Sequence, residues 1–286
     1  MTMTKSGGTA AIIKKYDVKA QKKYGQNFLI DENVLRRIVD AAGIGEEDTV
    51  LEIGPGTGAL TAFLCEKAGQ VIAVEIDKKL MPILEGSFKD RENVTLINGD
   101  IMKIDILSIL PDDCKSVKVA ANLPYYITTP IIMGLLEKKA PIESMTIMIQ
   151  KEVAERMLSL PGKKTYGALS LAVQYHTDAS AVMEVPPNCF IPRPKVSSSV
   201  MHLKVRKEPS VSVEDEELLF EIIRASFNQR RKTLLNGLKN YPGLQFSPEE
   251  ISKAIETLGK PSTIRGEQLS LEEFAKLSDI LGNIAH

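Results

Sequence analysis

The chain has 286 residues, enough for one domain of about 200 residues and a smaller second one. Hydrophobic residues make up 43% of the sequence and charged residues 26%, and no apolar run approaches the length of a membrane span. We therefore expect a soluble globular protein with no membrane partner. The formal net charge of −1 gives by itself no sign of a nucleic-acid partner.

The first residues carry no export signal. Residues 1–11 are rich in Thr and Gly and contain neither an apolar core nor a cleavage pattern. A cytoplasmic location is the expectation that follows.

From Thr49 onward, short runs rich in β-branched residues alternate with helix-like segments. This pattern is typical of an α/β protein, in which helices cover both faces of a largely parallel sheet. The predicted strands number seven and are Thr49–Ile53, Val71–Glu75, Val94–Ile97, Val117–Ala120, Ser144–Ile149, Ala181–Val185 and Ser198–Val205.

The last two predicted strands are separated by a proline-rich stretch that leaves no room for a helical crossover, so they should pair antiparallel. After Glu208 the pattern becomes helical, and Pro and Gly residues separate the helical segments. No convincing strand follows Glu208. We therefore predict a first domain over 1–207 and a small all-helical domain over 208–286.

Basic residues are unevenly distributed along the chain. They gather in 1–25, 193–207 and 224–239, while an acidic stretch at 214–221 cancels their sum. A solvated helix surface explains any one of these runs, but the three together are equally compatible with a phosphate-binding surface. The candidate phosphate contacts are Lys22, Lys23, Arg193, Arg230 and Arg231.

A glycine-rich turn follows the first predicted strand. Gly54, Gly56 and Gly58 lack Cβ atoms, so the backbone can adopt unusual φ values and approach a ligand at the carboxyl end of the sheet. Glu75 ends the next strand, where its carboxylate can accept hydrogen bonds from both hydroxyls of a ribose. This spacing predicts a cofactor that contains adenosine.

The glycine turn alone does not identify the cofactor, because Gly54, Gly56 and Ala59 also satisfy the relaxed fingerprint of nicotinamide dinucleotides. Two acids favour a sulfonium cofactor: Glu52 within the strand, and Asp100 after the third strand, where it can bind the exocyclic amine of adenine. A turn that begins a helix is the simpler interpretation of Asp100 taken alone.

The segment Asn122-Leu-Pro-Tyr-Tyr126 directly after the fourth predicted strand indicates the chemistry. The N6 amine of adenine is a poor nucleophile because its lone pair is delocalised into the ring. The side-chain oxygen of Asn122 and the carbonyl of Leu123 can hold the two N6 hydrogens and direct the lone pair at a methyl group, while Pro124 stiffens the turn.

Two aromatic residues can enclose an unstacked base. Tyr125 offers a face for stacking, which typically contributes about 1–3 kcal/mol per base. Phe190, in a proline-set loop, can close the other side, although a rigid connector with Phe190 in the core explains that loop equally well.

These segments together resemble the small-subunit (16S) ribosomal RNA adenine dimethyltransferases, which convert two adjacent adenines near the RNA 3′ end to N6,N6-dimethyladenosine. The resemblance covers most of the chain and implies a Rossmann-like, seven-stranded S-adenosylmethionine methyltransferase fold with a helical, RNA- or ribosome-binding C-terminal domain. It rests on Tyr24–Leu29, Glu52–Gly58, Val74–Asp77, Gly99-Asp100, Asn122–Pro130 and Phe190–Val196. Gly266 is a mild departure from the family's C-terminal pattern.

The resemblance also assigns roles. It implies that S-adenosylmethionine is held by Asn27, Leu29, Gly54, Gly56, Glu75, Ile76, Asp100, Ile101 and Asn122. It implies that the target adenine is held by Asn122, Leu123, Pro124, Tyr125 and Phe190.

Two other functions stay open at this point: dimethylation of large-subunit RNA, as in macrolide resistance, and ribosome assembly without catalysis. The segment Tyr126–Pro130 favours the small-subunit enzyme, and the presence of Glu75 and Asn122 favours catalysis. The expected partner is small-subunit RNA within pre-ribosomal particles. We expect a monomer with no metal.

Overall fold

The computed structural model describes residues 8–137 and 140–284, and the chain forms two compact units. Unit 1 comprises Met1–Ala154 and Ala179–Val205, and unit 2 comprises Glu155–Asp178 and Arg206–His286. The chain thus enters unit 2 twice. The assignment of separate domains to 1–207 and 208–286 stays a prediction.

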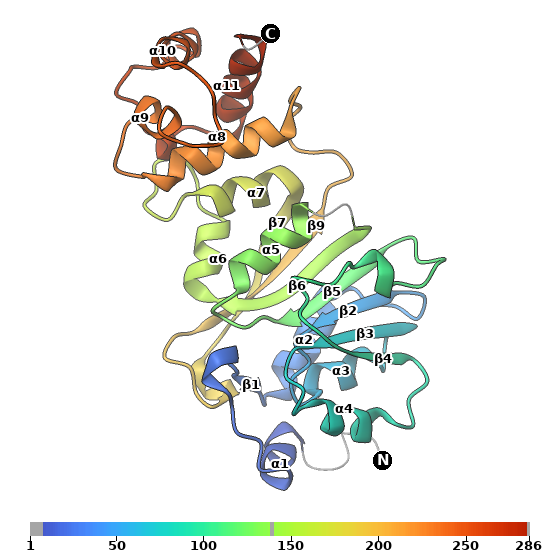
Figure 1. The fold of residues 1–286 in the computed structure, drawn as a ribbon. Coiled ribbons are helices and arrows are strands. Elements are labelled where there is room, and N and C mark those ends of the chain that lie inside the picture. The colour runs from blue at the N-terminus through green and yellow to red at the C-terminus, as the bar shows by residue number, and fades with distance from the viewer. Residues whose placement is uncertain (1–7, 138–139, 285–286) are drawn as a thin grey trace. The chain divides into compact units, whose positions relative to one another are not determined.

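A seven-stranded sheet dominates the described part of unit 1 (Figure 1). All seven predicted strands are present, which confirms the α/β fold. In sheet order they are β4 (Val94–Asn98), β3 (Gln70–Glu75), β2 (Thr49–Ile53), β5 (Val117–Asn122), β6 (Ile142–Gln150), β9 (Ser198–Val205) and β7 (Thr177–Val185). Neighbours from β4 to β6 are parallel, and β9 is antiparallel to β6. The carboxyl ends of β2, β3 and β5 therefore meet at one edge.

The last two strands are neighbours in the sheet, as the missing crossover predicts. The Ser199 hydroxyl donates to the Met183 carbonyl at 3.4 Å, and the Arg206 N–H donates to the His176 carbonyl at 2.8 Å. Residue numbers rise along one strand as they fall along the other, which is antiparallel pairing.

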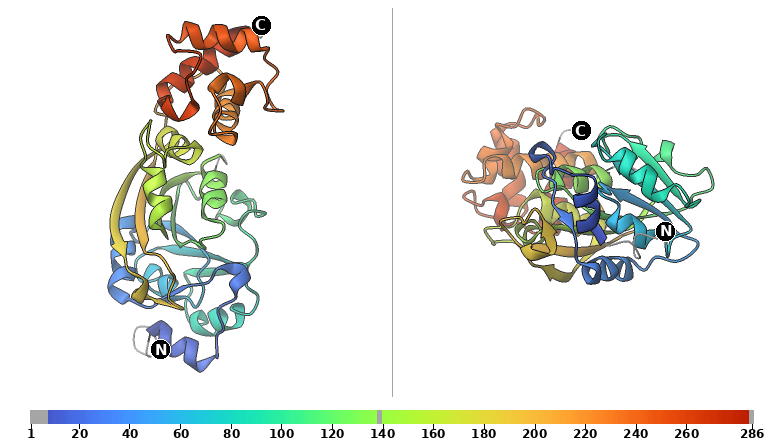
Figure 2. Two further views of the ribbon diagram at one scale, coloured as in Figure 1. Left: turned by 90° about the vertical axis from the view of Figure 1, so that its left-hand side faces the viewer. Right: turned by 90° about the horizontal axis from the view of Figure 1, so that it is seen from below.

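Helices pack on both faces of this sheet (Figures 1 and 2). On one face, α2 (Glu32–Ala42), α3 (Ala59–Leu64) and α4 (Met81–Phe88) bury their apolar side chains in a common core with the strands. Figure 1 shows α5 (Thr128–Glu137) on the other face. The buried strands consequently carry apolar residues on both sides.

The N-terminal segment adds elements that the sequence did not predict. After α1 (Gly8–Lys15) and the short 3-10 helix η2 (Lys22–Tyr24), the strand β1 (Phe28–Leu29) pairs antiparallel with β8 (Phe190–Ile191). Residues more than 150 positions apart in the sequence are thereby joined beside the glycine turn.

The described part of unit 2 is helical, and α6 (Lys151–Met157) leads the chain into it. Its other helices are α7 (Ala168–His176), α8 (Glu216–Asn228), α9 (Leu234–Leu238), α10 (Pro248–Thr257) and α11 (Leu271–Ile284). Aromatic rings join α7 to α8: Phe220 stacks on His176 with ring centroids 5.5 Å apart, and Tyr175 meets Phe220 edge-on at 5.2 Å. The remaining 3-10 helices in the described ranges are η3 (Leu107–Ile109), η4 (Pro187–Cys189) and η5 (Gly266–Gln268).

Among the described residues, no helix combines the length and the apolar character needed to cross a membrane.

Replacing Gly58 by Ala should destabilise unit 1. Gly58 has φ +86°, and an added Cβ would lie 2.6 Å from the Phe88 ring, so both the backbone and the packing must shift. We expect a loss of about 1–3 kcal/mol in the free energy of unfolding, measured by urea denaturation. Gly86→Ala is the matched control, because its Cβ meets nothing within 4 Å in a helix, and it should be neutral or stabilising. Equal effects of the two changes would contradict this account.

Acid should weaken unit 2 through His176. Burial lowers the pKa of His176 below its usual 6.5, partly opposed by the charge of Glu216, and Nε2 has no hydrogen-bond partner among the described residues. Since the unfolded chain binds this proton more readily, the free energy of unfolding should fall as pH drops below about 6.5. In His176→Phe, thermal unfolding followed from pH 7 to pH 5 should show a shallower fall than in the wild type. Identical pH profiles would refute the assignment.

Candidate active site

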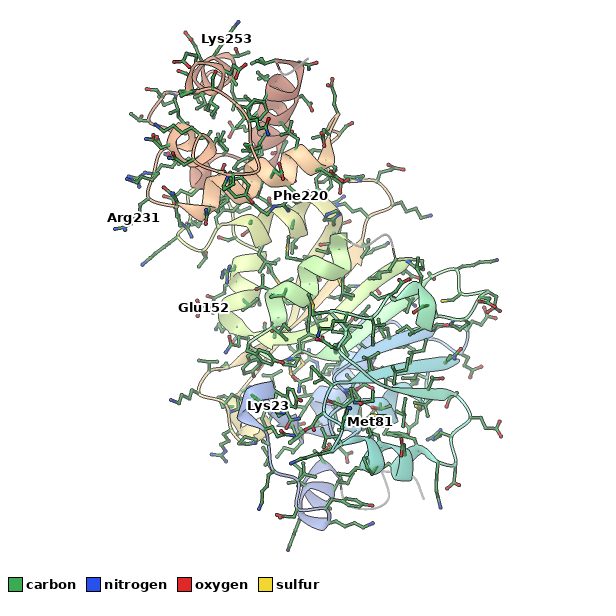
Figure 3. The ribbon with its side chains drawn as sticks, in the orientation of Figure 1. Lys23, Met81, Glu152, Phe220, Arg231 and Lys253 are labelled. Atoms are coloured by element: carbon green, nitrogen blue, oxygen red, sulfur yellow. The ribbon has the colours of Figure 1, made fainter. Side chains whose placement is uncertain are left out.

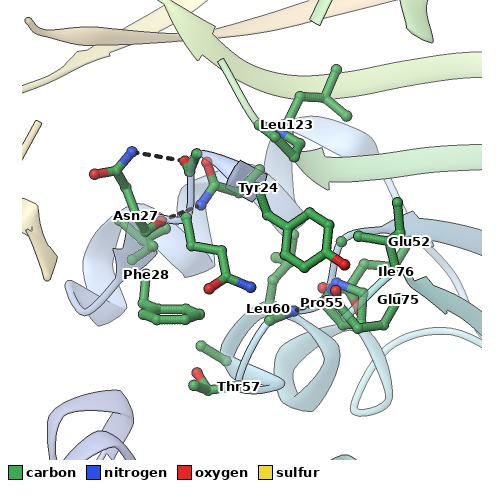
Figure 4. Close-up of a pocket in the computed structure, with 18 of the residues that line it drawn as sticks. Tyr24, Asn27, Phe28, Glu52, Pro55, Thr57, Leu60, Glu75, Ile76 and Leu123 are labelled. Carbon is green, nitrogen blue, oxygen red and sulfur yellow. Dashed lines mark hydrogen bonds between the residues drawn. The ribbon is translucent and has the colours of Figure 1, made fainter. Parts of the chain in front are cut away.

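A pocket lies at the carboxyl ends of β2, β3 and β5 (Figure 4). The parallel strands bring the glycine turn, the end of β3 and the Asn122 loop to one edge of the sheet, and the N-terminal segment covers them. The lining comes chiefly from residues 24–29, 54–57, 75–76 and 122–125. Four stretches distant in sequence therefore form a single site.

Gly54 and Gly56 are favoured at their positions in the turn for different physical reasons. Gly54 has φ +70°, and a Cβ there would meet no atom within 4 Å, so its face is open to the pocket. Gly56 has φ +61°, and its Cβ would lie 3.2 Å from the ring of Phe28. The turn thus leaves space for a ligand at Gly54 and packs against β1 at Gly56.

Glu75 is buried at the end of β3, with 4% of its surface exposed. One carboxylate oxygen accepts the Gly56 N–H at 3.0 Å, and the other accepts the Asp77 N–H at 2.8 Å. Burial raises the pKa of Glu75, while these two hydrogen bonds oppose the shift. Each oxygen keeps accepting capacity, which suits the two hydroxyls of a ribose.

A second, smaller pocket adjoins the same strand ends, and Asp100 and Ile101 line it together with Ile76 and Pro124. Asp100 also acts as a turn residue, since its carboxylate accepts the Met102 N–H at 3.0 Å. The turn interpretation of Asp100 and its place at a ligand pocket are therefore compatible.

Asn122 is the last residue of β5, and its amide is oriented by the N-terminal segment. The Asn122 side-chain N–H donates to the Asn27 carbonyl at 3.0 Å. Because the nitrogen must face a carbonyl, the Oδ1 oxygen points elsewhere, and among the described residues it accepts no hydrogen bond. The pocket therefore contains a side-chain oxygen that can accept a hydrogen bond from a ligand.

The turn after Asn122 is rigid. The Leu123 N–H donates to the Met148 carbonyl at 3.0 Å, and the Pro124 carbonyl accepts the Thr128 hydroxyl at 2.9 Å. The Pro124 carbonyl is therefore engaged within the loop, and the role of the Leu123 carbonyl as an acceptor stays a prediction. Tyr125 lines the pocket, and its hydroxyl shares a hydrogen bond of 2.5 Å with Ser198.

Phe190 is a core residue, with 1% of its surface exposed, and it packs with Leu29 and Leu35. It is not among the residues that line the pocket. The core interpretation of this loop therefore describes the structure, and a contact between Phe190 and a base stays a prediction.

The sequence pointed to Glu52 as a sign of a sulfonium cofactor but did not place it among the contact residues, and in the structure it lines the pocket. Its side chain is 1% exposed, and Oε2 has no hydrogen-bond partner among the described residues. Burial, together with the charge of Glu75, raises the pKa of Glu52 to about 8. Its position before the glycine turn was visible in the sequence, but its orphaned oxygen was not.

The pocket suits S-adenosylmethionine on two observations. The buried carboxyl groups of Glu52 and Glu75 can accept hydrogen bonds from ligand hydroxyls, and a positively charged ligand would stabilise their charged forms. The open face of Gly54 leaves room for its backbone to meet that ligand closely. No group of three or more His, Cys, Asp or Glu residues in the described ranges could hold a metal ion.

The candidate phosphate contacts fall into two groups. In unit 1, Lys23 and Arg193 are exposed, and the Lys23 ammonium lies 4.3 Å from the ring centroid of Tyr24, which lines the pocket. The side chain of Lys22 lies outside what the structure describes. In unit 2, Arg231 is exposed, whereas Arg230 pairs with the Glu267 carboxylate at 2.9 Å.

A family model described as ribosomal RNA adenine dimethylase matches residues 17–281. Ribosomal RNA small subunit methyltransferase A of Lachnoclostridium phytofermentans is 57% identical over 276 residues, which cover 96% of this chain and 95% of the relative. The protein of the same name from Bacillus pumilus is 50% identical over 277 residues, with 96% and 95% covered.

Solved structures agree. A dimethyladenosine transferase from Plasmodium falciparum superposes with a TM-score of 0.72 at 28% identity, covering 87% of this chain and 95% of that one. The 23S rRNA methyltransferase ErmE gives a TM-score of 0.65 at 26% identity, covering 90% and 100%. The chain belongs to the ribosomal RNA adenine dimethylase family of S-adenosylmethionine-dependent enzymes.

Proposed function

We propose that this enzyme methylates N6 of two adjacent adenines near the 3′ end of small-subunit (16S) ribosomal RNA, giving N6,N6-dimethyladenosine during biogenesis of the small subunit. The names of the relatives that are 57% and 50% identical support the small subunit as substrate. The observation that carries the chemistry is the orientation of Asn122, whose oxygen is left without a donor at the pocket.

The residues of the loop prepare the amine for attack. Asn122 Oδ1 accepts one N6 hydrogen and the Leu123 carbonyl accepts the other, so that the nitrogen lone pair is directed out of the ring plane. Tyr125 stacks on the base, and its hydrogen bond to Ser198 fixes the orientation of its ring. A base extruded from the RNA is held in this way.

The cofactor site is proposed to use Asn27, Leu29, Gly54, Gly56, Glu75, Ile76, Asp100, Ile101 and Asn122. When bound, S-adenosylmethionine supplies an electrophilic methyl group on its sulfonium sulfur. Glu75 binds the ribose hydroxyls, and Asp100 binds the adenine amine. Glu52 lines the same pocket with a pKa of about 8, and a cationic ligand there would stabilise its charged form.

The helical region 208–286 is proposed to bind RNA or the ribosome, with Arg231 on its surface (Figure 3). Lys22, Lys23 and Arg193 are proposed to contact phosphates from unit 1. We propose that the enzyme acts as a monomer on pre-ribosomal particles in the cytoplasm.

The proposal is tested by methyl transfer to small ribosomal subunits that lack the modification, followed by nucleoside analysis. We expect N6,N6-dimethyladenosine in 16S RNA. Label in large-subunit RNA instead would assign the chain to the resistance type, and binding of subunits without any label would favour an assembly factor without catalysis.

Replacing Asn122 by Ala should abolish most methyl transfer, because one of the two acceptors for the N6 hydrogens is lost. Loss of one such preorganised polar contact typically lowers the rate by about 100- to 1,000-fold. Single-turnover transfer to subunits measures the effect, and thermal unfolding and RNA binding check the fold. Asn240→Ala is the matched control, since among the described residues that side chain hydrogen-bonds only to the nearby Asn236 carbonyl. Transfer by Asn122→Ala near the wild-type rate would exclude the mechanism.

Single replacements of Lys23, Arg193 or Arg231 by Ala should weaken RNA binding and reduce its salt dependence. Each lost phosphate contact lowers the slope of log affinity against log salt by about 0.7 to 0.9. Filter binding between 50 and 200 mM salt measures the slope, and calorimetry with free cofactor should show unchanged affinity. A variant with the wild-type slope has no phosphate contact at that position.

A further inference from the structure

The segment Leu158–Thr165, between α6 and α7, is an exposed loop of unit 2 with a fixed backbone. The Gly162 N–H donates to the Glu267 carbonyl at 2.7 Å, and Gly162 has φ +79°. The hydroxyls of Ser159 and Thr165 share a hydrogen bond of 2.8 Å across the loop.

The base of the loop is anchored in the core. Tyr166, fully buried, donates its hydroxyl to the Leu269 carbonyl at 2.9 Å and meets the Phe227 ring edge-on. The Ser159 carbonyl accepts the side-chain N–H of Gln174 at 3.0 Å. The loop is therefore held from both of its ends.

Four outward side chains of this loop have no evident role in stabilising the fold. Leu158 and Leu160 are 42% and 63% exposed, among the largest apolar exposures of the described residues. Lys163 and Lys164 are exposed, and neither ammonium group has an ion pair or hydrogen bond within the described residues. Because the backbone is already fixed, binding a partner costs little backbone entropy, and only the side chains have to be ordered.

Arg230 places this loop beside the basic turn that follows α8. Its guanidinium donates to the Lys163 carbonyl at 3.3 Å and to the Glu267 carboxylate at 2.9 Å. The charge of Glu267 is thereby neutralised, and Arg231 and Lys232 follow in the chain, both exposed. Cations from two separate chain segments therefore share one surface of unit 2.

We propose that the loop Leu158–Thr165 is an RNA-binding element, in which Lys163 and Lys164 contact backbone phosphates next to Arg231 while Leu158 and Leu160 pack on the apolar faces of exposed nucleosides. The excess of unpaired positive charge favours RNA over a protein partner. This inference rests on the proposed function, since it takes ribosomal RNA as the partner.

The test compares binding of the full-length double variant Lys163→Ala/Lys164→Ala with that of the wild type. The probes are small ribosomal subunits lacking the modification and protein-free 16S RNA, each titrated between 50 and 200 mM salt. Loss of two phosphate contacts should lower the slope of log affinity against log salt by about 1.4 to 1.8. The wild-type slope in this variant would overturn the proposal.

Lys253→Ala/Lys276→Ala is the matched control, because both lysines are exposed in helices of the same unit and the net charge changes equally. It should keep the wild-type slope; an equal fall in both double variants would show a general charge effect and contradict a specific loop contact. Thermal unfolding and cofactor affinity should match the wild type in both, which separates loss of contact from loss of fold.

The leucines are tested with Leu158→Ser/Leu160→Ser, which should weaken binding to protein-free RNA without changing the salt slope. Weaker binding to intact subunits alone would mean that the leucines meet a ribosomal protein, and would overturn their assignment to RNA. Methyl transfer is read in the same samples: wild-type enzyme that binds but yields no dimethyladenosine contradicts the proposed function, while the slope comparison still decides the loop.

Discussion

A hydrogen bond from the Asn122 side chain to the Asn27 carbonyl joins the two halves of the active site at its reacting end. The strand ends of the sheet supply one half, and the segment that includes β1 supplies the other. An asparagine amide has two ends of opposite hydrogen-bonding character, so fixing the nitrogen also fixes where the oxygen points. The chemistry at the loop thus depends on a contact between residues 95 positions apart.

The same pocket contains a carboxyl group whose charged form is destabilised by burial. Burial raises the pKa of Glu52 to about 8, so the stability that its neutral form contributes is present below the usual pKa of 4.5 and is lost as pH rises towards 8. Because burial and the charge of Glu75 raise its pKa, the Glu52 carboxyl is mostly neutral near pH 7. A cationic ligand in the pocket offsets this cost, since it stabilises the charged form. The buried carboxyl groups of Glu52 and Glu75 therefore suit a ligand with positive charge better than an anion.

Local sequence pattern was sufficient for the seven strands of the sheet and for the glycine turn after β2, because strand periodicity and glycine spacing are local properties. It was insufficient where a residue's role depends on a distant partner. The pairing of Phe28–Leu29 with Phe190–Ile191 involves two very short strands with no periodicity to detect. Gly56 packs closely against the ring of Phe28, a neighbour that the local sequence does not reveal. The sequence of residues 155–178 likewise gives no sign of which unit these residues join.

The sequence alone overestimates how many basic residues are free to bind RNA. Arg230 and Arg231 are adjacent and equivalent in the sequence. In the structure Arg230 forms an ion pair with Glu267, whereas Arg231 is exposed. A guanidinium that already holds a carboxylate has less to gain from a phosphate, because part of its hydrogen-bonding capacity is taken. The number of cations available to RNA is therefore set by tertiary pairing, and a chain with a net charge of −1 can still present a strongly basic surface.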